Sequence, residues 1–382
     1  MSRFTAPHGL TQAELERYSR QLVLPELGPR GQRKLKESSA LVVGAGGLGI
    51  PASVYLVAAG VGRIGVVDTD IVEKSNLHRQ TIYSEQDVGR PKAQVAGERL
   101  RQVNPHTKVE SYETRLASAN ALEIIRGYDV VIDCTDNFPS RYLINDACVL
   151  LGKPDVYASI FRFDGQASVF DAKKGPCYRC LFPEPPPPDS VQDCAVAGVL
   201  GVLPGIMGSM QAVEAMKLML GRGEPLLGRL LLFNALDMSF NELRFKKNVT
   251  CPVCGKNPTI KSLIDYEAFC GLRTAPTVRE IAPLQLKHLI DKREAVTLLD
   301  VREPFEHQLC RIEGSKLIPL AQLRTRAGEL DKSAEIVVYC HVGARSAKAT
   351  ELLSALGFSK VRNLKGGIRA WSEDVDPRVP IY

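Results

Sequence analysis

The chain has 382 residues, of which 45% are hydrophobic, and its 49 basic and 43 acidic side chains give a formal net charge of +6. This length predicts two domains, or three, and the lack of long runs of like charge argues against a nucleic-acid-binding arm. We therefore expect a soluble globular protein that binds acidic small molecules or a modestly acidic partner, with no direct contact to nucleic acid.

The N-terminal segment MSRFTAPHGLTQAELERYSRQ lacks the apolar core of a signal peptide and does not resemble a transit peptide. The most apolar stretch, residues 195–220, contains Pro204, Gln211, Glu214 and Lys217, so we expect a buried helix there and no membrane span. We predict a cytoplasmic protein. In that reducing compartment, the 10 cysteines are expected to serve metal binding or thiol chemistry rather than disulfides.

Strand and helix patterns alternate through the N-terminal part of the chain. An apolar strand, a glycine turn and an Ala/Leu/Val-rich helix follow one another within residues 36–60, and a second buried strand lies within 63–70. Further helices are predicted around 90–104 and 118–127, with strands around 108–115 and 129–136. Because right-handed crossovers make neighbouring strands parallel, we predict an α/β fold with a doubly wound, Rossmann-like sheet.

The second half of the chain contains a break and then a new α/β pattern. Residues 183–198 are rich in proline, which fixes φ and removes hydrogen-bond donors, so we expect an irregular surface crossover. Periodicity is lost after Cys254 and returns near residue 278, in strands and a helix predicted around 295–302, 335–340 and 346–357. We predict domains at 1–255 and 278–382, joined by a linker at 256–277.

Gly44, Gly46 and Gly49 form the pattern G-x-G-x-x-G between the first strand and its helix. The missing side chains let backbone amides and the helix N-terminus approach phosphate oxygens, which indicates a nucleotide site. Asp68 ends the next strand, where a carboxylate can accept hydrogen bonds from ribose hydroxyls. The alternative for Asp68 is an ordinary cap at the end of a strand.

The residues that follow favour ATP over a nicotinamide dinucleotide. Asn76, Arg79 and Lys92 could converge on a polyanion, and a triphosphate that is being split needs such cations to hold the charge on its leaving group. Taken alone, each cation would be interpreted as a solvated surface charge. Asp136 lies at the carboxyl edge of the sheet and could bind Mg²⁺, whereas strand alternation makes Asp133 structural.

Six motifs, in this order and spacing, resemble the MoeB/ThiF branch of the ubiquitin-activating superfamily: RYSRQ, GAGGLG, the Asp68 strand, SNLHRQ, GRPKA and CTDN. The resemblance covers roughly residues 11 to 270. It implies adenylation of the C-terminal Gly-Gly carboxylate of a ubiquitin-like sulfur carrier protein of the MoaD, ThiS or CysO type, with release of pyrophosphate. It also implies a homodimer.

The resemblance assigns roles to residues of this chain. Asp68 would bind the ribose, and Asp136 would bind magnesium. The phosphates would be held by the glycine turn and by four side chains: Gly44, Gly46, Gly47, Arg20, Asn76, Arg79 and Lys92. In relatives, the equivalent of Arg20 reaches across the homodimer. His78 stands where many relatives carry glutamine, and we assign it no role.

Two C-x-x-C pairs, Cys177 with Cys180 and Cys251 with Cys254, can supply the four thiolates of a closed tetrahedral zinc site. For either C-x-x-C pair taken alone, the alternative is a redox-active pair of cysteines. Cys194 lies outside both pairs, in the proline-rich crossover. A lone cysteine is usually a small buried hydrophobe, but in similar proteins the matching cysteine takes part in thioester or persulfide transfer.

Cys340 follows an apolar strand, and the loop HVGAR leads from it into a helix. We expect an exposed thiol whose thiolate or persulfide is stabilised by backbone amides and by the helix N-terminus. With LLDVREPFE and GGIRAW, this loop resembles a rhodanese domain over about residues 278–382. A phosphatase is the alternative for a cysteine and an arginine in such a loop. The phosphatase families place five residues between the two, whereas Cys340 and Arg345 enclose four, and this tighter loop favours a sulfur atom over phosphate.

The joint hypothesis is an adenylyltransferase fused to a sulfurtransferase. Cys340 would take sulfur from thiosulfate or from a cysteine desulfurase persulfide and attack the acyl adenylate, and Cys194 would release the thiocarboxylate by forming a disulfide. The carrier could feed molybdopterin, thiamine, cysteine or tRNA thiolation. The alternatives are an NAD(P)-dependent oxidoreductase with an appended sulfur-binding module, and a non-enzymatic adaptor that docks carrier proteins.

Overall fold

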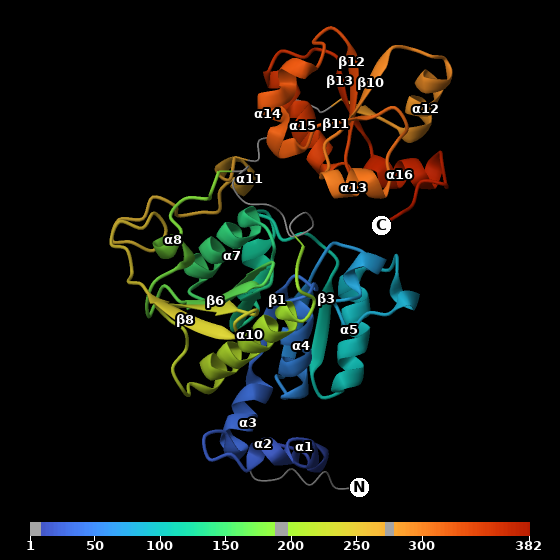
Figure 1. Ribbon diagram of the computed structural model, residues 1–382. Coiled ribbons are helices and arrows are strands. Elements are labelled where there is room, and N and C mark those ends of the chain that lie inside the picture. Colours follow the sequence, from blue (N-terminus) through green and yellow to red (C-terminus); the bar gives the residue numbers. More distant parts are fainter. Residues whose placement is uncertain (1–8, 188–197, 272–278) are drawn as a thin grey trace. The chain divides into compact units, whose positions relative to one another are not determined.

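A computed structural model describes residues 9–187, 198–271 and 279–382 of the chain (Figure 1). The chain divides into two compact units, Met1–Leu272 and Arg273–Tyr382, each with its own sheet. Among the described residues, no helix is both long enough and apolar enough to cross a membrane.

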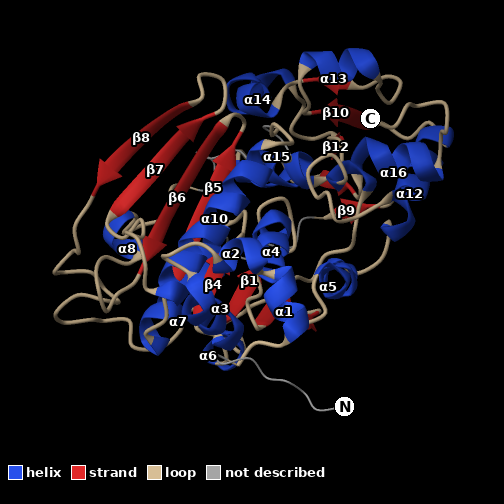
Figure 2. Cartoon of the chain, turned by 90° about the horizontal axis from the view of Figure 1, so that it is seen from below, coloured by secondary structure: helices blue, strands red, loops and turns tan. Residues whose placement is uncertain are grey.

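The described part of the first unit contains an eight-stranded sheet in the order β3-β2-β1-β4-β5-β6-β7-β8. Strands β1 to β5 pair in parallel, and β5 to β8 pair antiparallel, which Figure 2 shows as long neighbouring strands. The strands are β1 (Ser39–Val43), β2 (Arg63–Val67), β3 (Lys108–Tyr112), β4 (Val130–Asp133), β5 (Asp155–Phe161), β6 (Asp164–Phe170), β7 (Arg229–Asn234) and β8 (Ser239–Arg244).

Helices cover both faces of this sheet. Successive residues of a strand point to opposite faces, so each central strand contributes side chains to two cores. Ala40 and Val42 of β1 belong to one core and Leu41 and Val43 to the other. Helices α4, α5 and α10 pack in the first core, and α6, α7 and α11 in the second. The helices are α1 (Gln12–Arg17), α2 (Ser19–Leu22), α3 (Gly28–Glu37), α4 (Gly49–Ala58), α5 (Lys92–Val103), α6 (Ala121–Arg126), α7 (Phe138–Leu151), α8 (Tyr178–Leu181), α10 (Leu203–Leu220) and α11 (Tyr266–Phe269), with short helices η1 (Lys74–Asn76) and η2 (Glu85–Asp87).

The second unit is a smaller α/β layer structure. Its described strands form an all-parallel sheet in the order β11-β10-β12-β13-β9, and alternate residues of β12 again feed two cores. The elements are β9 (Glu280–Ile281), α12 (Pro283–Asp291), β10 (Val296–Asp300), α13 (Pro304–Leu309), β11 (Lys316–Leu317), α14 (Leu320–Arg326), η3 (Ala327–Glu329), β12 (Glu335–Tyr339), α15 (Ala344–Ala355), β13 (Val361–Leu364) and α16 (Gly367–Asp374).

The predicted fold class is confirmed: a doubly wound, Rossmann-like unit is followed by a second α/β unit. The antiparallel strands β6, β7 and β8 extend the sheet beyond what the sequence patterns predicted. Helix α11 lies inside the segment predicted as a linker, and its Tyr266 donates a hydrogen bond to the α7 residue Asp146 (2.9 Å). The boundaries at 255 and 277 remain predictions. Most of the predicted crossover, residues 188–197, lies outside the described residues.

Candidate functional site

The glycine turn connects β1 to α4 at the carboxyl edge of the parallel strands. Gly44 has φ +102°, and a Cβ there would lie 2.8 Å from the carbonyl oxygen of Cys134 at the end of β4. A Cβ on Gly49 would lie 1.8 Å from the carbonyl oxygen of Gly44. Side chains at these two positions would therefore collide with backbone, so the tight turn between β1 and α4 depends on glycine.

Asp68, directly after β2, holds this turn in place. Its Oδ2 accepts a hydrogen bond from the backbone N–H of Ala45 (2.7 Å), and its Oδ1 accepts one from Asp70 (2.8 Å). Burial raises the pKa of Asp68, although the two amides and Lys92 act in the opposite direction. The strand-end cap that we considered as an alternative is thus present, and a ribose contact remains a prediction.

Two predicted cations, Lys92 and Arg79, lie near the turn. Lys92 begins α5 with only 6% of its surface exposed, and its Nζ pairs with Asp70 Oδ2 at 3.0 Å. Arg79 lies over the turn, since its Cγ is 3.6 Å from the position of a Cβ on Gly47. Its guanidinium donates to the carbonyl oxygen of Ser75 (3.0 Å). A buried lysine whose partner is a largely exposed carboxylate is unlike an ordinary solvated surface charge.

Two amide side chains beside the turn have buried oxygens without a hydrogen-bond partner among the described residues, Asn76 Oδ1 and Gln80 Oε1. The amide nitrogen of Gln80 lies 3.6 Å from the position of a Cβ on Gly46. Buried polar atoms are normally hydrogen-bonded, so these groups are candidates for contact with a ligand. The sequence analysis assigned a role to Asn76 but missed Gln80, although Gln80 lies in the quoted motif SNLHRQ.

The carboxylates after β4 differ in their surroundings. Asp133 is buried, and its Oδ1 accepts hydrogen bonds from the backbone N–H and the hydroxyl of Thr135 (2.9 and 2.6 Å). Asp136 is exposed and accepts a hydrogen bond from Asn137 Nδ2 (3.3 Å), at the edge where Cys134 meets Gly44. Asp136 is therefore free to take a cation, whereas Asp133 is tied into the loop.

Arg20 is not part of this cluster within one copy of the chain. It lies exposed on α2, whose Gln21 donates a hydrogen bond to the carbonyl oxygen of Ala59 at the C-terminal end of α4 (3.1 Å). The glycine turn lies at the other end of α4, a helix of 10 residues, which corresponds to about 15 Å.

His78 contacts Arg79 at the rim of the turn. Its Nε2 lies 2.8 Å from Arg79 Nη1, and because arginine only donates, Nε2 accepts and the ring is neutral in this arrangement. Burial, and then the charge of Arg79, lower the pKa of His78, which agrees with a neutral ring. The imidazole also packs against Gly201, where a Cβ would be 2.8 Å from Nδ1.

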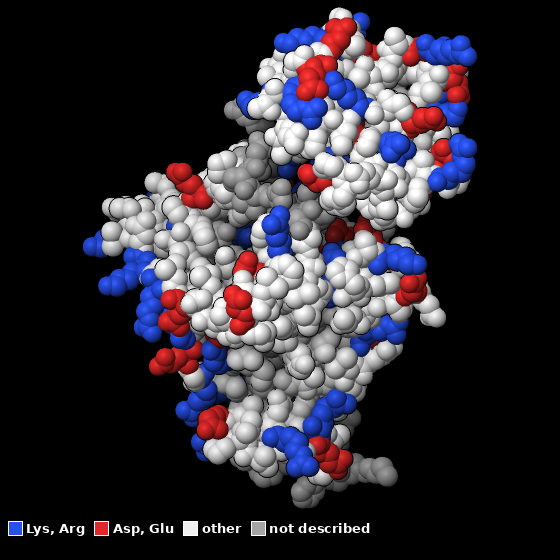
Figure 3. Space-filling model, viewed as in Figure 1, with Lys and Arg blue, Asp and Glu red and all other residues white. Residues whose placement is uncertain are grey.

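A large groove lies elsewhere in this unit, between α4 and α10. It has a volume of about 1020 Å³ and is lined mainly by apolar residues, among them Val54, Tyr55, Met210 and Val213. Tyr55 and Val213 are more than half exposed. Figure 3 shows few charged side chains over α4 and α10. An exposed apolar surface of this kind is typical of a protein contact rather than of a phosphate site.

The four paired cysteines form one cluster, and their sulfur atoms all lie within 4.8 Å of one another. Neighbouring sulfurs are 3.4 to 3.8 Å apart, close to the roughly 3.8 Å edge of a tetrahedron with Zn–S bonds of about 2.3 Å. The backbone N–H of Asn248 donates to Cys180 Sγ (3.3 Å). The donor set fits a structural zinc ion. Cys194 lies outside the described residues.

Cys340 follows β12 in the second unit, and it is 1% exposed, so the expectation of an exposed thiol is wrong. Its sulfur accepts hydrogen bonds from the backbone N–H of Gly343 (3.2 Å) and from the hydroxyl of Ser346 (3.4 Å). Gly343 has φ +98°, which turns its amide toward the sulfur, and α15 begins at the next residue. Among the described residues, one amide and one hydroxyl are thus within hydrogen-bond distance of the sulfur, and stabilisation by further amides remains a prediction.

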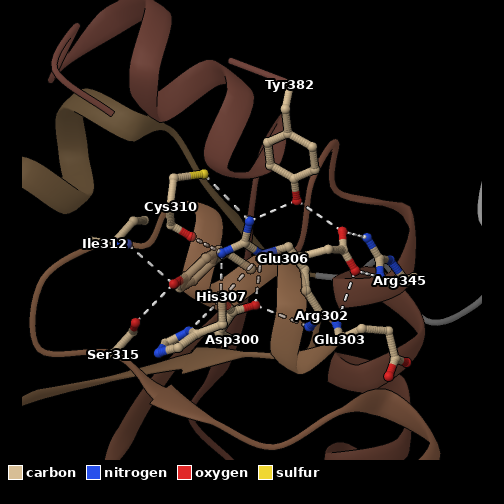
Figure 4. A network of polar contacts seen from close by, with 11 residues as sticks. Asp300, Arg302, Glu303, Glu306, His307, Cys310, Ile312, Ser315, Arg345 and Tyr382 are labelled. Atoms are coloured by element: carbon tan, nitrogen blue, oxygen red, sulfur yellow. Dashed lines mark hydrogen bonds and ion pairs between the residues drawn. The ribbon is translucent and has the colours of Figure 1, made fainter. Parts of the chain in front are cut away.

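Arg345, the second residue of α15, is bound by a carboxylate. Both of its terminal nitrogens lie 2.6 Å from the oxygens of Glu306 on α13 (Figure 4). Burial raises the pKa of Glu306, but the hydrogen bonds from Arg345, the backbone N–H of Glu303 and Tyr382, together with the charge of Arg345, lower it to about 2. The guanidinium is therefore held against an ionised partner. The sequence analysis identified Arg345 but did not predict Glu306 as its partner.

Comparisons with known proteins agree with this two-part organisation. The sequence model of the ThiF family matches residues 18–253, and that of the rhodanese-like domain matches residues 282–374. A sulfur carrier protein adenylyltransferase from Thermus thermophilus is 60% identical over 69% of this chain and 99% of its own length. A probable adenylyltransferase/sulfurtransferase MoeZ from Mycobacterium tuberculosis is 45% identical over 98% of this chain and 96% of its own length.

Two further comparisons extend this result. The adenylyltransferase and sulfurtransferase MOCS3 from Mus musculus is 43% identical over 98% of this chain and 88% of its own length. A crystal structure of E. coli MccB with ATP superimposes with a TM-score of 0.56 and 23% identity, over 63% of this chain and 74% of that chain. At that identity, the structural likeness supports the fold alone.

Proposed function

The chain belongs to the ThiF family and is an adenylyltransferase with a rhodanese-like sulfurtransferase domain, and from this premise we propose that its substrate is the C-terminal Gly-Gly carboxylate of a ubiquitin-like sulfur carrier protein. The carrier would be of the MoaD, ThiS or CysO type, serving molybdopterin, thiamine, cysteine or tRNA thiolation. The predicted resemblance to the MoeB/ThiF branch with a rhodanese domain is confirmed.

One observation carries the adenylation step: two cations, and two buried amide oxygens without a partner among the described residues, lie near the glycine turn. The carrier carboxylate attacks the α-phosphorus of ATP, the bond to pyrophosphate breaks, and pyrophosphate leaves with the electron pair. Arg79 and Lys92 hold the negative charge that develops on the leaving group, and Asp68 receives the ribose. Asp136 would hold Mg²⁺, which neutralises phosphate charge when bound.

The second unit then supplies sulfur as a persulfide on Cys340, formed from thiosulfate or from a cysteine desulfurase persulfide. The terminal sulfur attacks the acyl carbon, and AMP leaves. The Cys194 thiolate next attacks the Cys340 side of the acyl disulfide, which releases the thiocarboxylate and leaves a Cys194–Cys340 disulfide. A cellular thiol reductant restores both thiols. The hydrogen bonds from Gly343 and Ser346 to the Cys340 sulfur support an anionic sulfur there.

The remaining proposals concern assembly. Cys177, Cys180, Cys251 and Cys254 would hold a structural zinc ion, because their sulfurs have tetrahedral spacing. The chain would act as a homodimer in which Arg20 reaches the partner's nucleotide, and the apolar groove between α4 and α10 would be covered by the partner. We propose a cytoplasmic protein without membrane or nucleic-acid partners.

Pyrophosphate exchange tests the proposed function. The chain, with ATP, Mg²⁺ and a panel of carriers ending in Gly-Gly, should exchange labelled pyrophosphate into ATP, and the Cys340→Ala variant should keep this exchange while losing thiosulfate-to-cyanide sulfur transfer. Cys310→Ala, which alters another buried cysteine of the same unit, should keep both. Absence of exchange with every carrier would contradict the proposal. Thermal protection by NAD but not by ATP would favour the oxidoreductase alternative.

A further inference from the structure

Tyr382 contacts the residue that follows the sulfur-bearing cysteine. Its ring stacks on the imidazole of His341, with the ring centres 4.5 Å apart and an angle of 22° between the planes. Its hydroxyl accepts a hydrogen bond from Arg302 Nη1 (2.7 Å) and lies 2.8 Å from Glu306 Oε1 (Figure 4). The Tyr382 side chain therefore contacts His341 of the Cys340 loop and also the charged groups of Arg302 and Glu306.

Arg302 fixes the position of the Tyr382 hydroxyl. The Arg302 side chain is fully buried, and its Nε and Nη2 donate to Asp300 (2.9 and 2.6 Å), while Nη2 also donates to the carbonyl oxygen of Cys310 (2.7 Å). A guanidinium cannot accept a hydrogen bond, so the Tyr382 proton points to Glu306. The hydroxyl thus bridges a fixed cation and an ionised carboxylate.

Glu306 extends the contact to the other end of the loop. Its two oxygens bind Arg345 in a fork, and Oε2 also accepts a hydrogen bond from the backbone N–H of Glu303 (2.9 Å). Such bidentate, charge-assisted pairs fix orientation as well as distance. Tyr382 therefore braces both ends of the segment between His341 and Arg345, and the amide of Gly343 that binds the sulfur lies in its middle.

We propose that Tyr382 is a positioning residue for sulfur transfer, holding the Cys340 loop through its ring on His341 and through its hydroxyl on Glu306. This inference rests on the proposed function, namely that Cys340 carries the transferred sulfur. A loop fixed at both ends keeps its hydrogen-bond donors aligned with the sulfur during attack, and the rates of such steps are sensitive to small displacements.

The reaction used as a readout has two balanced steps. The Cys340 thiolate attacks the outer sulfur of thiosulfate, the sulfur–sulfur bond of thiosulfate breaks, and sulfite leaves with the electron pair. Cyanide then attacks the terminal sulfur of the persulfide, the new sulfur–sulfur bond breaks, and thiocyanate and the thiolate are formed. The second step can be followed alone if the protein is loaded first and freed of excess thiosulfate.

The test compares Tyr382→Phe and Tyr382→Ala with the wild-type full chain. Intact-mass spectrometry measures the fraction of protein carrying one extra sulfur atom, and stopped-flow kinetics gives the rate of cyanide attack per loaded persulfide. We expect that rate to fall about fivefold in Tyr382→Phe, which loses the hydroxyl but keeps the stacked ring. It should fall further, by about twentyfold, in Tyr382→Ala. Pyrophosphate exchange by the first unit should be unchanged.

Tyr339→Phe is the matched control. It removes a hydroxyl from the same unit, one that binds Ser315 (2.8 Å) and the backbone N–H of Ile312 (3.3 Å). Whatever its effect on the melting temperature, this control should leave the rate per loaded site unchanged. The inference is overturned if both Tyr382 variants react at the wild-type rate. It is also overturned if the loaded fraction and the melting temperature of the Tyr382 variants fall while the rate per loaded site is unchanged, because that result shows a structural role. Failure of the wild type and the control to load sulfur would instead reject the proposed function.

Discussion

Lys92 differs from an ordinary surface lysine because its side chain is buried. A lysine that is 6% exposed has given up most of its hydration, and its partner Asp70 is largely exposed to water. Burial of an ammonium group costs free energy unless a counter-charge compensates it. A bound triphosphate would provide a larger counter-charge than one exposed carboxylate. Lys92 is therefore better explained by a ligand than by its ion pair alone.

Replacing either cation beside the glycine turn should impair adenylation. Lys92→Ala and Arg79→Ala each remove one positive side-chain charge that would stabilise the leaving pyrophosphate. We therefore expect pyrophosphate exchange to fall by at least about 100-fold. Lys74→Ala is the matched control, because Lys74 lies on the same segment but is 77% exposed and pairs with Glu85. Thiosulfate-to-cyanide transfer should be normal in all three variants. Equal exchange rates in Lys74→Ala and Lys92→Ala would remove the argument for this site.

At the scale of elements, sequence patterns predicted those parts of the candidate site that depend on residues close together in the chain. The glycine turn was predictable because the β1–α4 connection leaves no space for a Cβ at Gly44 or Gly49. Strand β8 was not predicted, since most of its residues are exposed and no apolar alternation marks it. The contacts of Tyr382 were not predictable either, because its hydroxyl partners lie 76 and 80 residues away in sequence and no periodicity encodes such a pairing.

The cysteine cluster joins elements that are distant in sequence. Cys177 caps the start of α8 and Cys180 lies within it, while Cys251 and Cys254 lie 74 residues later, between β8 and α11. Between the first pair, the buried Arg179 binds Asp146 with two hydrogen bonds of 2.8 Å, and Tyr266 of α11 donates to the same carboxylate. A metal at the cluster would therefore stabilise α8 and also the docking of α11 against α7.

Metal analysis should find one zinc ion per chain in the purified protein. Cys251→Ser should lose that zinc and lower the melting temperature of the first unit, since three thiolates bind zinc less tightly and the link between distant segments is weakened. Cys270→Ser, which changes a buried cysteine outside the cluster, should keep the zinc. Full retention of zinc by Cys251→Ser, measured by inductively coupled plasma mass spectrometry, would contradict the assignment.

Two buried carboxylates on neighbouring strands should make stability depend on pH. Burial and the nearby Asp133 raise the pKa of Asp155 on β5, and Asp155 Oδ1 has no hydrogen-bond partner among the described residues. The folded state therefore holds a proton that the unfolded state, with a pKa of about 3.9, releases. Stability from this group is present below that unfolded pKa and is lost as pH rises through the raised folded pKa.

Asp155→Asn should reduce this loss of stability. Removal of one of the two like charges should raise the free energy of unfolding at pH 8 by about 1 to 3 kcal/mol and should change it less at pH 5. Asp164→Asn on the exposed start of β6 is the control, and its stability difference should not depend on pH. Urea denaturation of each variant at both pH values measures these differences. A variant that is less stable than the wild type at pH 8 would reject the account.

At the scale of the whole molecule, each compact unit buries its own cores and contains its own candidate site. The first unit has the cations and the glycine turn, and the second has Cys340. Two reactions can therefore be abolished independently by substitutions, which is the basis of the controls above. Within one copy, however, the proposed adenylation site lacks one of its predicted members, because Arg20 lies beside the far end of α4.

A homodimer would supply Arg20 from the second copy, and subunit complementation can test this arrangement. Arg20→Ala and Lys92→Ala should each be inactive in pyrophosphate exchange when expressed alone. In a mixed dimer, the subunit that carries Arg20→Ala keeps its own Lys92 and receives Arg20 from its partner, so one intact site is restored. Co-expression of the two variants should therefore recover activity only if Arg20 acts between copies.

The matched control co-expresses Lys92→Ala with Arg79→Ala, which alter the same site of each subunit and should give no recovery. If Arg20 acted within its own copy, the mixed dimer would contain no complete site and both co-expressions would be inactive. Recovery in the first mixture alone would also account for the apolar groove between α4 and α10. Gln21, next to Arg20, and the exposed Tyr55 and Val213 line an adjoining hollow, so a partner seated on this face would lie directly beside Arg20.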